Sequence, residues 1–167
     1  AAALRRAASS QGDGVHGSVR ISASEVVGVE VLPPILAALR ARYPRLVIEL
    51  MLSNQADDLL HREADIAVRM FRPVQDALVA KKIGAIELAL FAHPDYLAAH
   101  GTPATTAELA GHSLIGYDRR TAFIRAFEAQ FPWLSRERFA LRADSDLAQL
   151  AALRAGFGIG VCQVRLA

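Results

Sequence analysis

The sequence predicts an α/β fold built on a parallel sheet. A short apolar run at residues 18–23 has the length of a strand, an amphipathic stretch at 32–43 has the spacing of a helix, and a second apolar run follows at 46–52. Strands that alternate with helices in this way are typical of parallel sheets with right-handed crossovers. A polar turn follows each strand. Ligands bind at the carboxyl edge of such a sheet, because loops diverge there and helix N-termini point inward, so the sequence predicts a small-molecule site and favours an anion.

The first helix is indicated by apolar residues that recur at intervals of three and four, namely Leu32, Ile35, Leu36, Leu39 and Tyr43. Proline is tolerated only near a helix start, so Pro33 and Pro34 imply that residues 26–31 form a separate or loose first turn. Pro44 ends the helix. A short helix is expected at 56–63, followed by a third strand at 64–69 whose apolar middle argues against a solvated edge.

A second alternation of strands and helices follows a loop at 70–77. Its expected elements are two extended pieces at 78–92 hinged at Gly84, helices at 93–100, 121–131 and 146–155, a turn with a helical stub at 102–110, and strands at 113–117, 138–143 and from 156 onward. Residues 144–146 would cap the last helix, and Gly156 would stop it.

These elements predict a two-lobed chain. Residues 1–16 are interpreted as the tail of a linker helix with a flexible hinge, 17–80 as lobe I, 81–143 as lobe II with crossover strands, and 144–167 as a return segment into lobe I. The extended segments 78–92 and 138–144 are expected to pair as crossovers, and a ligand held between the lobes would be largely enclosed.

Composition excludes several classes of protein. With 167 residues, 53% hydrophobic and 22% charged, the chain has the make-up of a well-packed domain. No apolar run approaches the roughly 20 residues needed to cross a bilayer, and the N-terminus lacks the apolar core of a secretory signal. The single cysteine, Cys162, excludes an internal disulfide and fits a reducing compartment such as the cytoplasm. Net charge is +2 and the arginines are scattered, which argues against nucleic-acid binding by this segment alone.

The sequence gives no support for a catalytic site or a metal site. The glycines at 156–160 precede a strand rather than a helix, so they do not form a dinucleotide fingerprint. The five histidines never fall at i, i+4 spacing, and there is no second cysteine for a zinc site. We therefore expect neither an enzyme nor a bound cofactor or metal.

The candidate ligand-binding residues stand at strand ends. Ser24 would bind a carboxylate together with exposed backbone N–H groups, although Ser22 and Glu25 also fit a capping box that begins the helix. Ser53, Asn54 and Gln55 repeat the polar turn after the second strand. Arg69 could clamp a carboxylate, or pair at the surface with Asp65 or Glu63.

Two further positions carry alternatives of the same kind. Asp144 and Ser145 fit a helix cap as well as a site, and the cap is the simpler interpretation. Phe157, which is flanked by glycines, could wall an apolar pocket or fill the core.

A series of motifs resembles the effector-binding (regulatory) domain of LysR-type bacterial transcription regulators. The most diagnostic are READIAVR at 62–69, HPDYL at 93–97 and AGFGIG at 155–160. Supporting segments occur in the same order at 20–24, 32–34, 42–44, 48–50, 53–59, 78–84, 100–103, 109 and 144–146. The resemblance runs from about residue 17 to residue 167.

The resemblance implies a type II periplasmic-binding-protein fold, with the inducer in the cleft between two α/β lobes. It implies an upstream winged helix-turn-helix and linker helix, of which residues 1–10 would be the last remnant. It also implies that the family continues beyond residue 167 with elements that complete the first lobe, and Gln163 stands where the family more often has proline. By position, the family's ligand contacts fall at Ser24, Ser53, Asn54, Gln55, Arg69, Met70, Phe71, Tyr117, Ser145 and Phe157.

The functional prediction is an inducer-sensing domain that binds a small organic anion. The resemblance implies a homodimer or tetramer that contacts DNA only through the N-terminal module, with no membrane contact. The alternative is a stand-alone solute-binding protein of the same fold, against which the absent signal peptide and the helical N-terminal remnant count.

Overall fold

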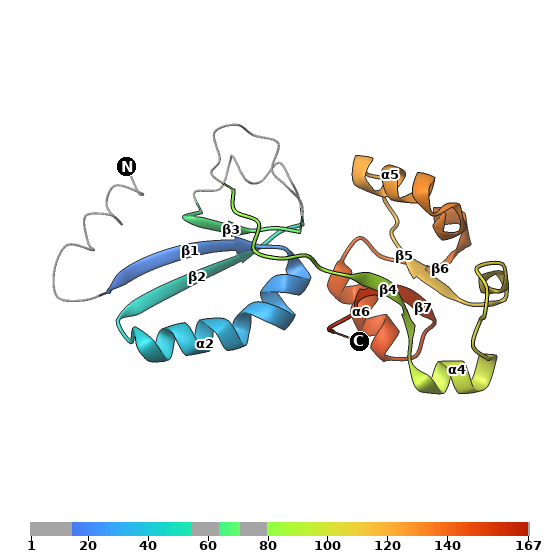
Figure 1. Ribbon diagram of the computed structural model, residues 1–167, viewed down its shortest axis with the longest axis horizontal. Coiled ribbons are helices and arrows are strands. Elements are labelled where there is room, and N and C mark those ends of the chain that lie inside the picture. The colour runs from blue at the N-terminus through green and yellow to red at the C-terminus, as the bar shows by residue number, and fades with distance from the viewer. Residues whose placement is uncertain (1–14, 55–63, 71–79, 167) are drawn as a thin grey trace. The chain divides into compact units, whose positions relative to one another are not determined.

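The computed structural model describes residues 15–54, 64–70 and 80–166, which divide between two compact units, 1–84 and 85–167. The first unit contains β1 (Gly17–Ala23), a π-helical turn η1 (Val27–Val31), α2 (Leu32–Arg42), β2 (Leu46–Leu52) and β3 (Ile66–Val68). Its strands form a parallel sheet in the order β2-β1-β3, and α2 lies along the β1–β2 pair (Figure 1). The predicted strands at 18–23 and 46–52 and the parallel sheet are confirmed. The helix expected at 56–63 lies outside the described residues.

Alternation along β1 explains how this unit packs. Ile21 and Ala23 are buried with Val27 and Leu32, and Leu36 packs against the same cluster, so every second residue of β1 faces the helix. The intervening residue Ser22 therefore points to the opposite face of the sheet. This division places polar side chains on one face of β1 and the small apolar core on the other.

The chain becomes helical directly after β1, beginning at Glu25, and runs through η1 into α2. Pro33 and Pro34 have no N–H to return to the preceding turn, so the regular hydrogen-bond series is interrupted where η1 meets α2. The loose first turn predicted for 26–31 is thus a π-helical turn continuous with the helix. Gly28 lies in this turn, and a Cβ there would collide with the side chain of Leu52.

The third strand differs from its prediction. β3 is shorter than expected, lies at the side of the described sheet, and leaves Ile66 51% exposed. The apolar middle of 64–69 therefore does not mark a central strand in the described part of the chain. Val68 of this strand packs against the core cluster under the helix, whereas Ile66 does not belong to it.

The second unit contains β4 (Leu88–Ala92), α4 (Pro94–His100), η2 (Glu108–Gly111), β5 (Leu114–Gly116), α5 (Ala122–Gln130), η3 (Pro132–Leu134), η4 (Arg136–Arg138), β6 (Phe139–Arg142), α6 (Asp146–Arg154) and β7 (Ile159–Gln163). Its sheet has the order β4-β7-β5-β6 (Figure 1). β5 is parallel to β6 and β7, whereas β4 is antiparallel to β7. Each helix predicted for this half is present within one or two residues.

Two predictions about chain routing need correction. Residues 144–167 were expected to return to the first lobe, but α6 and β7 belong to the second unit, where β7 pairs with both β4 and β5. Residues 138–144 were expected to be a crossover, but β6 pairs with β5 in the same sheet. The ring of Phe139 in β6 lies so close to Gly116 in β5 that a Cβ at residue 116 would collide with it.

Candidate functional site

The polar turns after β1 and β2 meet at the carboxyl edge of the first sheet. Because these strands are parallel and in register from Gly17–Leu46 to Ala23–Leu52, they end at the same edge. The Ser53 N–H donates to the Ala23 carbonyl oxygen at 2.9 Å, and the Glu25 N–H donates to Asn54 Oδ1 at 3.0 Å. The Asn54 side-chain oxygen is therefore the acceptor for the first N–H of the helix. Helix N-termini favour anions and hydrogen-bond acceptors.

Arg69 reaches the same edge from β3. Its Nη2 donates to Ser22 Oγ at 2.7 Å and its Nη1 donates to the Val68 carbonyl oxygen at 3.1 Å. Met70 follows it and is exposed. The guanidinium is therefore held over β1, on the face of the sheet opposite the helix.

Ser24 stands between these groups, directly before the helix. Its carbonyl oxygen accepts the Gly28 N–H at 2.8 Å, and the residue is only 8% exposed. Its Oγ is buried and has no hydrogen-bond partner among the residues that the structure describes. A buried hydroxyl without a partner is costly and uncommon, so it calls for an explanation.

The capping box is not what begins this helix. Ser22 lies inside β1 and accepts from Arg69, while the Glu25 amide takes the side chain of Asn54 as its acceptor. Sequence reasoning therefore missed the role of Ser22, although the alternation that predicts β1 places this residue within the strand. Of the other predicted contacts, Gln55 and Phe71 lie outside the described residues.

The second unit has an equivalent edge at the carboxyl ends of β5 and β6. Tyr117 follows β5, and its hydroxyl donates to Asp146 Oδ1 at 2.9 Å. Burial raises the pKa of the Tyr117 phenol well above its ordinary range, and the nearby charge and hydrogen bond of Asp146 add to this. Ser145 Oγ accepts the Ala148 N–H at 3.4 Å, which confirms its interpretation as the cap of α6. Phe157 is 42% exposed and therefore does not fill the core.

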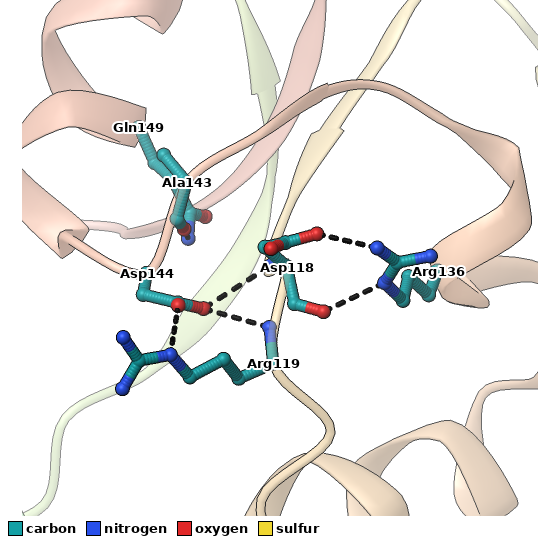
Figure 2. A network of polar contacts seen from close by, with 6 residues as sticks. All are labelled: Asp118, Arg119, Arg136, Ala143, Asp144 and Gln149. Carbon is teal, nitrogen blue, oxygen red and sulfur yellow. Dashed lines mark hydrogen bonds and ion pairs between the residues drawn. The ribbon is translucent and has the colours of Figure 1, made fainter.

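Asp144 organises the loop that follows Tyr117, as Figure 2 shows. Its Oδ1 accepts the backbone N–H groups of Asp118 at 3.2 Å and Arg119 at 2.8 Å, and its Oδ2 pairs with Arg119 Nε at 3.0 Å. Arg136 holds the other side of the loop, donating from Nε to the Asp118 carbonyl oxygen at 2.7 Å and from Nη2 to Asp118 Oδ1 at 2.6 Å. Gln149 Nε2 donates to the Ala143 carbonyl oxygen at 2.7 Å, so α6 is tied to the same segment.

The same loop is anchored to α5 by a buried carboxylate. Glu128 is 7% exposed, and its Oε2 accepts from Arg120 Nε at 2.9 Å and lies 2.8 Å from Arg120 Nη2. Its Oε1 accepts the Arg136 N–H at 3.2 Å. Asp118, Glu128 and Arg136 form no sequence motif, so only the fold reveals that they act together.

Other possible sites are less well supported. Two open apolar hollows in the second unit, with volumes of about 310 and 370 Å³, contain none of the predicted ligand contacts among their lining residues. Across the described ranges, no cluster of histidine, cysteine and acidic side chains could hold a metal ion. Among the same residues, no helix is long and apolar enough to cross a membrane.

Comparison with known proteins gives a consistent set of relatives. A family model for the LysR substrate binding domain matches residues 12–167. The chain is similar to the HTH-type transcriptional regulator CrgA of Neisseria meningitidis serogroup B, with 32% identity over 102 residues covering 61% of this chain and 34% of that protein. It is also similar to the HTH-type transcriptional activator AaeR of Escherichia coli K12, with 29% identity over 104 residues covering 62% of this chain and 34% of that protein. The chain spans about a third of the length of these relatives.

Solved structures agree with this assignment. The regulatory domain of CrgA from Neisseria meningitidis matches with a TM-score of 0.76 and 26% identity, over 91% of this chain and 75% of that chain. Full-length AphB, a Vibrio cholerae virulence activator, matches with a TM-score of 0.73 and 29% identity, over 97% of this chain and 56% of that chain. These likenesses confirm the predicted α/β fold of the type II periplasmic-binding-protein class. The relatives are transcriptional regulators, and this confirms the expectation that the chain is not an enzyme.

Proposed function

We infer a sensory role for this chain, which belongs to the LysR substrate binding domain family. We propose that it binds a small organic anion at the carboxyl edge of the first sheet, with the carboxylate held by Ser24, by the turn at Ser53 and Asn54, and by Arg69. The chain would be the effector-sensing part of a LysR-type regulator. The contributions of Gln55, Met70, Phe71, Tyr117, Ser145 and Phe157 stay predictions.

The observation that carries this proposal is the buried Ser24 hydroxyl. It lies at the N-terminus of the helix that runs from Glu25 to Arg42, where partial positive charge gathers. Asn54 meets the first amide of that helix, and Arg69 is held on the neighbouring strand end. A carboxylate oxygen would supply the acceptor that this hydroxyl lacks among the described residues, and an arginine nearby would favour its charge.

The coupling to transcription rests on the relatives, which are helix-turn-helix regulators. We propose that the full-length protein carries such a module on its N-terminal side and works as a dimer or tetramer in the cytoplasm. Effector binding would favour one arrangement of the regulator over another, and the two arrangements would differ in DNA affinity. A ligand can shift such an equilibrium only by its difference in affinity for the two states.

The test is calorimetry on the 167-residue chain with benzoate, L-malate and L-glutamate, which sample aromatic, dianionic and amino-acid carboxylates. At least one should bind, and Ser24→Ala should weaken its binding about tenfold, the value of one hydrogen bond to a charged group. The same substitution should leave the free energy of unfolding unchanged or raise it by about 1 kcal/mol, since it removes a buried hydroxyl without a partner. Ser18→Ala, elsewhere in β1, is the matched control. Absence of binding by all three probes, or full affinity in Ser24→Ala, would show the proposal to be wrong.

A further inference from the structure

The Ser22 hydroxyl is the acceptor that holds Arg69, and its burial makes the contact specific. Ser22 is 3% exposed, and its Oγ accepts from Arg69 Nη2 at 2.7 Å. Hydrogen bonds with an ionised donor are stronger than neutral ones, and they are stronger still where water is excluded. A buried hydroxyl facing a guanidinium at this distance therefore restrains the arginine.

Arg69 contacts Ser22, although the register of the sheet would bring it beside a different residue of the first strand's edge. Ser22 pairs with Ala67 and Ala23 with Val68, so continuation of the ladder would bring Arg69 beside Ser24. The side chain instead turns back along β1 to Ser22, and its Nη1 bonds to the Val68 carbonyl oxygen at 3.1 Å. With both terminal nitrogens anchored, the plane of the guanidinium is fixed.

We propose that Ser22 is a positioning residue: it preorganises the Arg69 guanidinium for anion binding at the edge where Ser24 and Asn54 lie, an inference that rests on the proposed function. A free arginine loses rotamer freedom when it binds a ligand, and an arginine already held in place loses less. Ser22 thus raises ligand affinity through Arg69 without contacting the ligand.

The first test needs no ligand. In ¹⁵N NMR spectra, the Arg69 Nε–H signal is identified by its loss in Arg69→Lys, and its exchange with water and fast motion are measured. Ser22→Ala should speed exchange and increase motion, Ser22→Thr should restore the wild-type values because it keeps the hydroxyl, and Ser18→Ala should change nothing. An Arg69 signal that is unchanged in Ser22→Ala overturns the inference.

The second test is a double-mutant cycle by calorimetry with the tightest binder among benzoate, L-malate and L-glutamate. Ser22→Ala should weaken binding about threefold to tenfold, the cost of ordering one long side chain. In an Arg69→Gln background the same change should have no effect, because the group that Ser22 positions is gone. Equal losses in both backgrounds would overturn the inference. If Arg69→Gln alone binds with full affinity, Arg69 does not contact the ligand, and the inference is overturned even where the NMR result shows that Ser22 orients Arg69.

Discussion

Asn54 caps a helix that follows a different strand, since its Oδ1 accepts the backbone N–H of Glu25 at 3.0 Å across 29 positions of sequence. A helix N-terminus normally takes its cap from the residue just before it, which here is Ser24. The Ser24 hydroxyl has no hydrogen-bond partner among the described residues, so the side-chain acceptor at this helix start comes from Asn54 instead. The arrangement links the two polar turns of the candidate site through one hydrogen bond.

Substitution of Asn54 should separate its capping role from its role in binding. Asn54→Ala should lower the free energy of unfolding by about 0.5–2 kcal/mol, the usual cost of losing a cap. Asn54→Asp keeps the acceptor and adds a charge that the helix N-terminus favours, so it should retain most of the stability. The same charge should weaken carboxylate binding by repulsion. Urea denaturation and calorimetry measure the two effects, and equal destabilisation by both substitutions would contradict the capping role.

The Arg120–Glu128 pair should stabilise the second unit because its carboxylate is buried. Glu128→Gln should cost about 1.5–3 kcal/mol of unfolding free energy, the range for hydrogen bonds to charged groups, with the lower end favoured because the Arg120 side chain is 54% exposed. Arg120→Gln should cost a similar amount, since it leaves the carboxylate buried with fewer partners. The double variant should cost less than the sum of the two.

The matched control for this pair is Arg119→Gln. Arg119 pairs with Asp144 at the surface, with a side chain that is 79% exposed, so its loss should cost at most about 1 kcal/mol. If Arg119→Gln and Arg120→Gln destabilise the chain equally in urea, burial of Glu128 adds nothing to the pair.

The local pattern was sufficient to predict the elements of this fold. β1 and β2 are present within a residue of their predicted bounds, because alternating or continuous apolar residues reflect burial directly. The pairing of Leu88 with Gln163 could not be predicted, because the two strands are far apart in sequence and nothing local encodes their partnership. The routing of residues 144–167 was wrong for the same reason.

In the candidate site too, features set by local geometry could be predicted and long-range contacts could not. The convergence expected of Ser24 with Ser53 and Asn54 follows from the geometry of any parallel sheet, and their strands do end at one edge. The partner of Ser22 was missed because a capping box can be recognised within four residues, whereas its contact with Arg69 spans 47 positions. Local motifs describe what a residue can do alone, and tertiary contacts decide between the possibilities.

Asp144 should act on the loop after β5 mainly through its acceptor oxygen. Asp144→Asn keeps an oxygen for the amides of Asp118 and Arg119 and loses only an exposed ion pair, so it should cost at most about 1 kcal/mol. Asp144→Ala leaves both amides without this acceptor and should cost about 1–2 kcal/mol more. Thermal and urea unfolding would measure the difference. If Asp144→Asn is as damaging as Asp144→Ala, the charge and not the acceptor holds the loop.

Tyr117 should make the stability of the chain fall in alkali. Burial, with the charge of Asp146 and the hydrogen bond at 2.9 Å, raises the pKa of its phenol in the folded chain above the ordinary value of 10.0. Above that value the unfolded chain releases the proton while the folded chain keeps it, so the folded state binds more protons and unfolding becomes easier as pH rises. The stabilising contribution is therefore fully present below about pH 10 and is lost above it.

Tyr117→Phe removes this ionisation, so its urea midpoint should fall less steeply than that of the wild type between about pH 9 and 12.

Titration of phenolate absorbance gives an independent measurement of the same group. The chain has three tyrosines, so the absorbance rises as the sum of three ionisations. The substitution should remove the component that ionises at the highest pH and leave the earlier ones in place. Parallel stability curves for the two proteins, or loss of an early-titrating component, would contradict the burial of this hydroxyl against Asp146.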